Sequence, residues 1–133
     1  MRTLFKRWAP ALIVMLAIFL ISSRPSDRLP DFHSADHIVK ATGHVIGYGL
    51  LACSYLYALG PVKQRYGLAW IFAILYGISD EIHQSFVPGR SSSVSDVLLF
   101  DNLGAVAALS IYYYVLTKTN IRRNQPLRAA ETE

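Results

Sequence analysis

Apolar residues along the chain come in long uninterrupted blocks rather than in the short alternations of a soluble fold. The first block, residues 8–23 (WAPALIVMLAIFLISS), contains no charged residue. The second block, residues 41–62, is also uncharged if His44 is neutral, and two shorter blocks follow at 66–79 and 102–117. Blocks of this kind are typical of membrane-spanning helices, which need roughly 20 predominantly apolar residues.

The two shorter blocks reach a spanning length only when the polar flanks 80–86 and 96–101 are included in the helices. The pattern therefore predicts four transmembrane helices, near residues 5–23, 38–59, 66–86 and 96–117. We expect an all-α fold, an integral membrane four-helix bundle over residues 5–117. The remaining residues, 118–133, are basic and polar, and they are expected to form a disordered cytoplasmic tail.

The first apolar block has a second interpretation as a cleaved signal peptide. A basic start, an apolar stretch and the small residues Ser22 and Ser23 are features of such peptides. However, no A-x-A-like site follows, and Arg24-Pro25 is a poor context for cleavage. We therefore expect residues 5–23 to be retained as a helix.

Composition and charge agree with a membrane protein and set its orientation. The chain has 133 residues, enough for one domain, and its mean hydropathy of +0.31 is high for a soluble protein. Nine of the thirteen Lys and Arg residues lie at the N-terminus, near residue 63 or in the C-terminal tail, which share one side of the predicted bundle. The positive-inside rule then places both termini of this multi-pass protein in the cytoplasm. The net charge of +4 therefore needs no nucleic-acid partner.

Polar residues interrupt the apolar pattern at three places that this topology brings to one depth, toward the outer leaflet. They occupy the end of the third helix, the start of the fourth and the start of the second: Asp80, Glu81 and Gln84; Asp96, Asp101 and Asn102; Lys40, His44 and Tyr48. Steps of four place Lys40, His44 and Tyr48 on one helix face. Small residues four apart, such as Gly43 and Gly47, let membrane helices approach closely. The pattern thus predicts a shallow polar pocket that opens outward.

Energetics favour such a pocket over exposure of the acids to lipid. A carboxylate at the centre of a membrane helix costs about 2.5–3.5 kcal/mol on insertion scales. Asp80 and Glu81 should therefore pair with Lys40, His44 or Arg90, or one of them should keep its proton. The alternative is that both acids lie at the interface, solvated by water and lipid headgroups.

Arg90 is the expected closing residue of this pocket. It follows the Pro-Gly turn at residues 88–89, so its side chain can fold back over the end of the third helix. We expect it to form a charged network with a carboxylate, with Asp96 or Glu81 as partner. His83 is out of line with the polar face and is expected at the membrane interface.

Familiar chemical motifs are absent from the sequence. It contains no P-loop, no Rossmann glycine run, no H-E-x-x-H and no cysteine pair spaced for zinc. Glu81, His83 and His44 do not have the spacing of a known metal motif. No metal and no cofactor are expected, and the single cysteine, Cys53, cannot form an internal disulfide.

The stretch SDEIHQSFVPGRSSSVSDVL (79–98), followed by DNLGA (101–105), resembles the VanZ-like family of small bacterial membrane proteins. That family shows an acid pair and a Gln, an Arg after a Pro-Gly turn, and a D/N-x-x-G at the start of its last helix. A Lys and a His before a Tyr are similar to those in DHIVKATGHVIGYGLL (36–51). One departure is that Asp96 and Asp101 are five residues apart instead of four. Either a local bulge restores the shared face, or Asp101 and Asn102 divide the role.

The resemblance implies a function outside the cytoplasm. The name-giving member of the family is linked to resistance to teicoplanin, a glycopeptide that acts on cell-wall precursors. We therefore expect an integral protein of the cell inner membrane that acts at the cell envelope and whose pocket binds a lipid-linked cell-wall precursor or an anionic lipid headgroup. Arg90 and Lys40 would hold phosphate or carboxylate, and Asp80, Glu81 and Asp96 would orient them or act as acid and base.

Two other classes of function stay open. One is an intramembrane enzyme with Asp80 or Glu81 as general base, because adjacent acids that share a site raise one pKa. The other is a proton-coupled carrier, since intramembrane acids and histidines also mark proton paths. Four helices are few for a carrier, so that class would require an oligomer.

Overall fold

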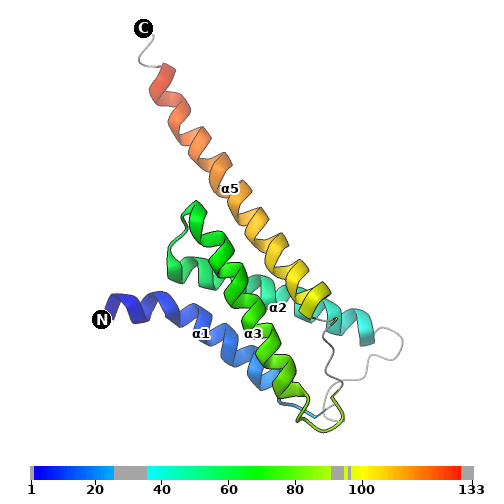
Figure 1. Cartoon of the computed structure of the whole chain (residues 1–133). Helices are drawn as coiled ribbons and strands as arrows, with labels where there is room; N and C mark the ends of the chain where they lie inside the picture. The colour runs from blue at the N-terminus through cyan, green and yellow to red at the C-terminus, as the bar shows by residue number, and fades with distance from the viewer. Residues whose placement is uncertain (1, 26–35, 91–94, 96, 130–133) are drawn as a thin grey trace.

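The computed structural model describes the backbone of residues 2–25, 36–90, 95 and 97–129, and the side chains within 5–25, 37–90, 95 and 97–119. Over these residues the chain is helical, with no strand, which confirms the all-α class. In chain order the elements are α1 (Arg2–Ser22), α2 (Asp36–Leu59), the 3-10 turn η3 (Lys63–Arg65), α3 (Tyr66–Gln84), the π-helical turn η4 (Val97–Asp101) and α5 (Asn102–Ala129) (Figure 1).

Each of the four expected helices is present, and the largest difference lies at the C-terminal end. The fourth helix was expected to stop near residue 117, followed by a disordered tail, but α5 continues to Ala129. Charge alone does not end a helix, because extending an existing helix is far easier than starting one. The residues after 117 include Lys, Arg, Gln, Leu and Ala, which are all good helix formers.

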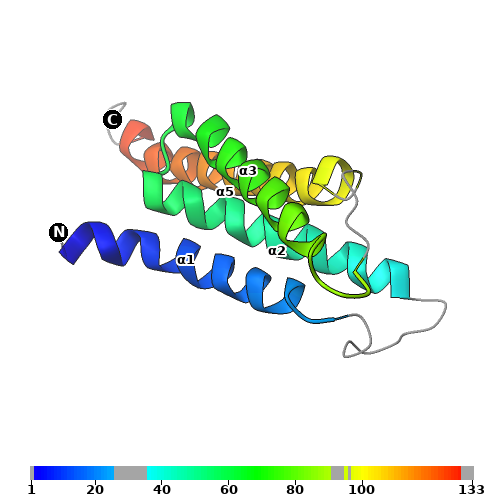
Figure 2. The ribbon, with the colours of Figure 1, turned by 60° about the horizontal axis from the view of Figure 1, so that its bottom comes forward.

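Helix α2 is the central element of the bundle. It packs against α1, α3 and α5, whereas α1 makes most of its contacts with α2 alone. Figure 2 shows the N-terminus, the α2–α3 connection and the far end of α5 on one side of the molecule. The ends of α1 and α3 and the starts of α2 and α5 therefore lie together on the opposite side.

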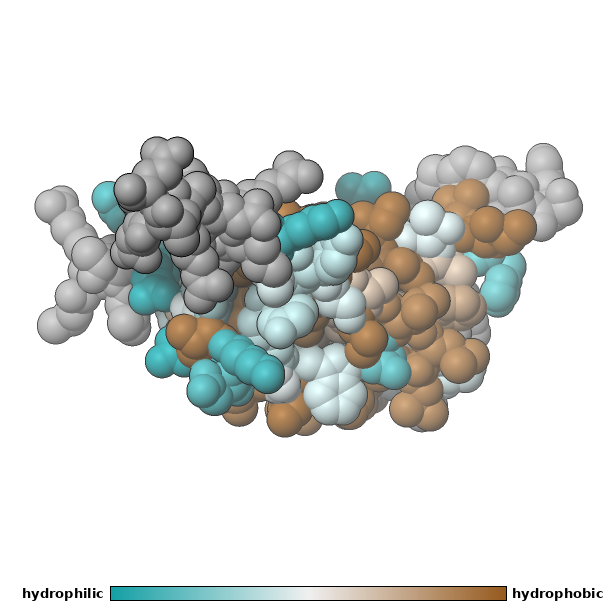
Figure 3. Space-filling view, turned by 90° about the horizontal axis from the view of Figure 1, so that it is seen from above, coloured by the Kyte–Doolittle hydropathy of each residue, from teal (hydrophilic) through white to brown (hydrophobic). Residues whose placement is uncertain are grey.

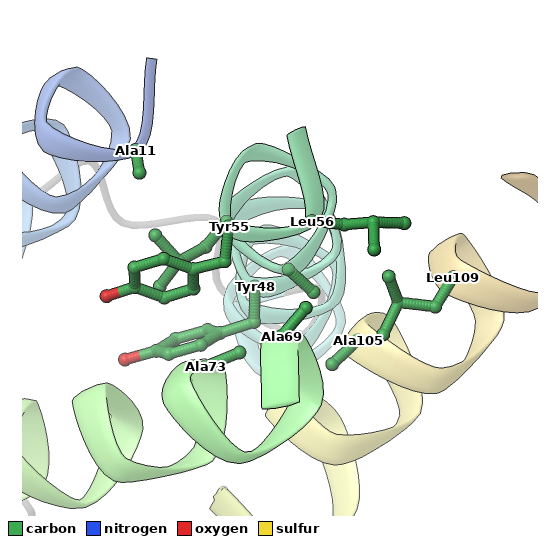
Figure 4. Close-up of a cluster of buried hydrophobic side chains, with 10 residues drawn as sticks. Ala11, Tyr48, Tyr55, Leu56, Ala69, Ala73, Ala105 and Leu109 are labelled. Atoms are coloured by element: carbon green, nitrogen blue, oxygen red, sulfur yellow. The ribbon is translucent and has the colours of Figure 1, made fainter. Parts of the chain in front are cut away.

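The helices pack through small and aromatic residues. The buried cluster combines alanines from α1, α3 and α5 with large side chains that come mainly from α2: Ala11, Tyr48, Leu51, Ala52, Tyr55, Leu56, Ala69, Ala73, Ala105 and Leu109 (Figure 4). Glycines bring α2 and α5 closest together, because a Cβ at Gly104 would overlap the carbonyl of Val45. A Cβ at Gly49 would lie 3.1 Å from the carbonyl oxygen of Gly104. Close backbone contact at small residues is the packing mode of membrane helices.

Large apolar side chains lie on the outside of the bundle. Among the most exposed are Ile13, Leu16, Leu50, Leu75 and Ile111, and Figure 3 shows apolar residues over much of one face. So large an apolar surface marks a membrane or partner contact. Among the described residues, two helical stretches are long and apolar enough to cross a membrane, Phe5–Ser22 and Val97–Thr119. The spanning of α2 and α3 stays a prediction.

Candidate functional site

Seven side chains from four elements form what we call the polar cluster. They come from the end of α1, the start of α2, the end of α3 and the π turn: Ser22, His44, Tyr48, Asp80, Glu81, Gln84 and Asp101. All except His44 are buried. Six of the seven were expected to lie together, and they do.

Asp80 is held from two sides. Its side chain is 4% exposed, and its Oδ2 accepts a 2.7 Å hydrogen bond from Gln84 Nε2, one turn further along α3. This bond follows directly from the i, i+4 spacing. Ser22 Oγ donates to Asp80 Oδ1 across 2.6 Å and so ties the end of α1 to α3. Ser22 was missed because nothing in the sequence pairs it with residue 80.

Asp101 and His44 form the second carboxylate centre. Asp101 is fully buried, and its Oδ1 lies 2.8 Å from Nδ1 of His44, whose side chain is 21% exposed. The other carboxylate oxygen, Oδ2, would lie 3.0 Å from a Cβ at Gly77. Asp101 therefore reaches its buried position because α3 carries no side chain at the point of contact.

Tyr48 lies between the two carboxylate centres. Its side chain is buried, and its ring is nearly parallel to that of His44, with centroids 6.0 Å apart and an interplanar angle of 9°. The carboxyl groups of Asp101, Asp80 and Glu81 all interact electrostatically with this tyrosine. The polar cluster is thus one connected group rather than two separate pairs.

The π-helical turn explains the unusual spacing of the two acids near the start of the fourth helix. η4 spans Val97–Asp101, and a π turn closes its hydrogen bond between residues five apart. The bulge that the five-residue spacing called for is therefore present in the backbone. Asp96 lies outside the described residues, so its share in the site stays a prediction.

Arg90 has different partners from those expected. Its Nη2 donates to the carbonyl of Ile21 across 2.8 Å, and its Nε donates to the carbonyl of Arg24 across 3.3 Å. These carbonyls at the end of α1 are the partners that Arg90 has among the described residues, whereas a pairing of Arg90 with Asp96 lies outside those residues and stays a prediction. The physical reason is that the last carbonyls of a helix lack intrahelical partners and attract a cation.

Two further predicted residues lie outside the polar cluster. Asn102 turns toward α3, where its Oδ1 accepts a 2.8 Å hydrogen bond from Trp70 Nε1. Lys40 is exposed on α2, one turn before His44. Lys40 is therefore placed at the edge of the cluster, whereas Asn102 joins α3 to α5.

His83 was expected at the membrane interface, but it contacts α1. Its Nε2 lies 2.9 Å from Ser23 Oγ, and its ring centroid is 4.6 Å from that of Phe19. The prediction that His83 lies out of line with Asp80 is correct, but α1 covers the face of α3 on which His83 lies. The sequence pattern gives no sign of which face of α3 meets α1.

The two carboxylate centres suit different chemical roles. Both Asp80 oxygens accept hydrogen bonds from other side chains, so Asp80 is better suited to hold the cluster together than to exchange a proton. His44 is partly exposed and oriented by a buried carboxylate, which is the arrangement that directs an imidazole as a base. Among the described residues no group of three His, Cys, Asp or Glu side chains could hold a metal ion.

Comparison with known proteins shows that the chain matches one protein family. A family model described as VanZ/LLP1 matches residues 5–117, which is nearly the whole chain and includes every residue of the polar cluster. This match confirms the resemblance seen in the sequence. Neither the curated proteins nor the solved structures contain a significant match to the chain.

Proposed function

The chain belongs to the VanZ/LLP1 family, and from this premise we propose that its polar cluster binds a group of an envelope lipid or of a lipid-linked cell-wall precursor. The observation that carries the proposal is the burial of Asp80, Glu81 and Asp101 in a chain whose large apolar side chains face outward. Ionisable side chains at membrane depth are costly and occur mainly at functional sites. The proposal includes an inner-membrane location with the cluster toward the outer leaflet, as the charge pattern predicts.

The chemistry of the cluster suggests which part of such a lipid it would meet. Three carboxyl groups accept hydrogen bonds, so the interior suits hydroxyl or ammonium groups, such as those of a sugar or an amine-bearing headgroup. Lys40, exposed one turn before His44, is placed to meet a phosphate. Arg90 donates to the end of α1, so of the two residues expected to hold phosphate or carboxylate the proposal keeps Lys40 in that role.

The His44–Asp101 pair favours a second candidate, an intramembrane enzyme that acts on the same lipid. The sequence offers Asp80 and Glu81 as acid or base, and the structure adds His44, a partly exposed histidine oriented by the buried carboxylate of Asp101. Turnover of a purified envelope lipid by the reconstituted protein, lost in His44→Gln, would distinguish catalysis from binding. Proton flux in proteoliposomes would instead indicate a carrier.

The proposal is tested by comparing the envelope lipids and cell-wall precursors of a deletion strain with those of complemented strains. We expect wild type to restore the profile and the Glu81→Gln and Asp101→Asn variants to fail, at equal protein levels in the membrane. Ser79→Ala is the matched control, because Ser79 precedes Asp80 on α3 but is exposed and bonds only to its own helix.

Glycopeptide susceptibility is measured in the same strains, because the member that gives the family its name is linked to resistance to teicoplanin. Full restoration of the lipid profile by both carboxylate variants would refute a role for the polar cluster. Failure of Ser79→Ala as well would show that the defect comes from the helix rather than from the buried acids.

A further inference from the structure

A groove lies between α3 and α5, away from the polar cluster. Its volume is about 460 Å³, and its lining includes Lys63, Tyr66 and Trp70 on one side and Val106, Leu109 and Tyr113 on the other. Trp70 precedes Asp80 by ten residues, or about 15 Å along the helix axis. This α3–α5 groove is therefore separate from the candidate site.

The groove is bounded by specific contacts between its two helices. Toward the start of α5, Trp70 Nε1 donates to Asn102 Oδ1 across 2.8 Å and joins the two walls. Toward the other end, the rings of Tyr66 and Tyr113 meet edge to face with centroids 5.7 Å apart. Leu109 is buried and connects the groove to the packed core. These contacts fix the aromatic walls in place.

The shape and charge of the groove limit what it can hold. The volume lies within the roughly 300–1,000 Å³ range of small-molecule sites. The lining is mainly apolar, and its one charged residue, Lys63, lies just before α3 begins, where the chain also places Arg65. An apolar slot with a cation at its end matches an acyl chain attached to an anionic headgroup.

We propose that the α3–α5 groove binds one acyl chain of an anionic phospholipid, with the phosphate held at Lys63. This site goes beyond the function proposed for the polar cluster and does not depend on it. A Lys or Arg near a membrane surface favours anionic lipid by roughly five-fold. The groove adds a defined place for the acyl chain. The preference for anionic lipid should therefore appear at one position on the protein surface.

Trp70 provides a direct reporter of what occupies the groove. The chain has two tryptophans, Trp8 and Trp70, so Trp8→Phe leaves the groove indole alone. The variant is reconstituted in phosphatidylcholine vesicles that contain a small fraction of lipid with brominated chains, which quench indole fluorescence on contact. We expect brominated phosphatidylglycerol to quench Trp70 several-fold more than an equal fraction of brominated phosphatidylcholine.

Two substitutions separate the headgroup contact from the chain contact. Lys63→Gln should reduce the preference for phosphatidylglycerol by roughly five-fold, while Lys118→Gln, whose ammonium lies over Tyr114, should leave it unchanged. Gly67 also lines the groove, and nothing lies within 4 Å of a Cβ there. Gly67→Leu should therefore fill the groove without disturbing the fold and reduce quenching by both lipids.

Matched controls make each outcome decisive. Gly43→Leu places the same side chain at another open helical position, on α2, and should leave quenching of Trp70 intact. A Trp70→Phe protein reports from Trp8 and should show no lipid preference. Equal quenching of Trp70 by both brominated lipids would mean unselective contact with the bilayer and would overturn the proposal. Quenching by neither lipid, together with a dependence on protein density, would show a second copy in the groove and would overturn it equally.

Discussion

The absence of one side chain decides how closely α3 approaches the π turn. A Cβ at Gly77 would lie 3.0 Å from Asp101 Oδ2 and 3.2 Å from Cε1 of Tyr48, both closer than ordinary contact. Both neighbours are themselves buried, so neither can move aside easily. Residue 77 is therefore a determinant of the polar cluster although it contributes no functional group.

Gly77→Ala is accordingly expected to destabilise the protein. Overpacking of a tight contact costs about 1–3 kcal/mol, and better helix propensity returns at most about 1 kcal/mol. The control Gly43→Ala, where nothing lies within 4 Å of the new Cβ, should be neutral or stabilising. Thermal unfolding in detergent measures the stability of both variants. A Gly77→Ala protein as stable as wild type would contradict the close packing at Gly77.

The contact between His44 and Asp101 should appear as an energetic coupling. We expect His44→Gln and Asp101→Asn to be non-additive by about 0.5–3 kcal/mol, because the two side chains are 2.8 Å apart and Asp101 is fully buried. A double-mutant cycle of unfolding free energies gives this value. Additive effects of the two substitutions would mean that each group is solvated independently.

At the scale of elements, arginines from one part of the chain complete helix ends in another. Arg90 binds the carbonyls that follow the last turn of α1. The end of α2 also receives hydrogen bonds from arginines. Arg65 donates to the carbonyl of Leu59, and Arg7 donates to the carbonyl of Tyr57. Each guanidinium donates to a carbonyl in or just after the last turn of a helix, at the favourable end of the helix dipole.

The effect of removing Arg90 distinguishes this capping role from a buried ion pair. We expect Arg90→Ala to lower the unfolding free energy by about 1–2 kcal/mol, and Arg90→Lys to recover only part, because a lysine cannot reproduce the guanidinium fork. Arg24→Ala, which removes an exposed neighbouring cation, is the control. A loss of about 3–5 kcal/mol for Arg90→Ala would instead indicate a broken buried ion pair.

At the scale of the whole molecule, the arrangement of helix ends agrees with the charge pattern. The N-terminus, the α2–α3 connection and the far end of α5 share one side (Figure 2), and that side carries the basic excess. The polar cluster lies toward the other side, at the ends of α1 and α3. The orientation of the helices in a membrane therefore decides which compartment the polar cluster faces.

Labelling of single cysteines from outside the cell tests this orientation in a Cys53→Ser background. Positions 27–33 and 91–94 should react with an impermeant reagent, and positions 62–65 and 120–130 should react only after the membrane is opened. The basis is the positive-inside rule. External labelling of positions 62–65 would reverse the topology and place the polar cluster on the cytoplasmic side.

The sequence by itself determined the elements and the gathering of polar residues toward one end of the helices. Long apolar blocks predicted four helices, and steps of four predicted that His44 and Tyr48 would share a face, where their rings lie nearly parallel. The five-residue interval between two acids, set against the family pattern, left a bulge as one of two alternatives, and a π turn lies there. These features are local, since they depend only on residues within one or two helical turns.

Only the tertiary structure decided which helices meet and which residues complete the site. Ser22 reaches Asp80, His83 meets α1, and Arg90 binds a carbonyl at the end of α1. These contacts depend on how each helix is rotated and how closely it approaches its neighbour. Periodicity gives the face of a helix but not its partner. Small differences, such as the absence of a Cβ at Gly104, set the distance between backbones and so select the contacts that form.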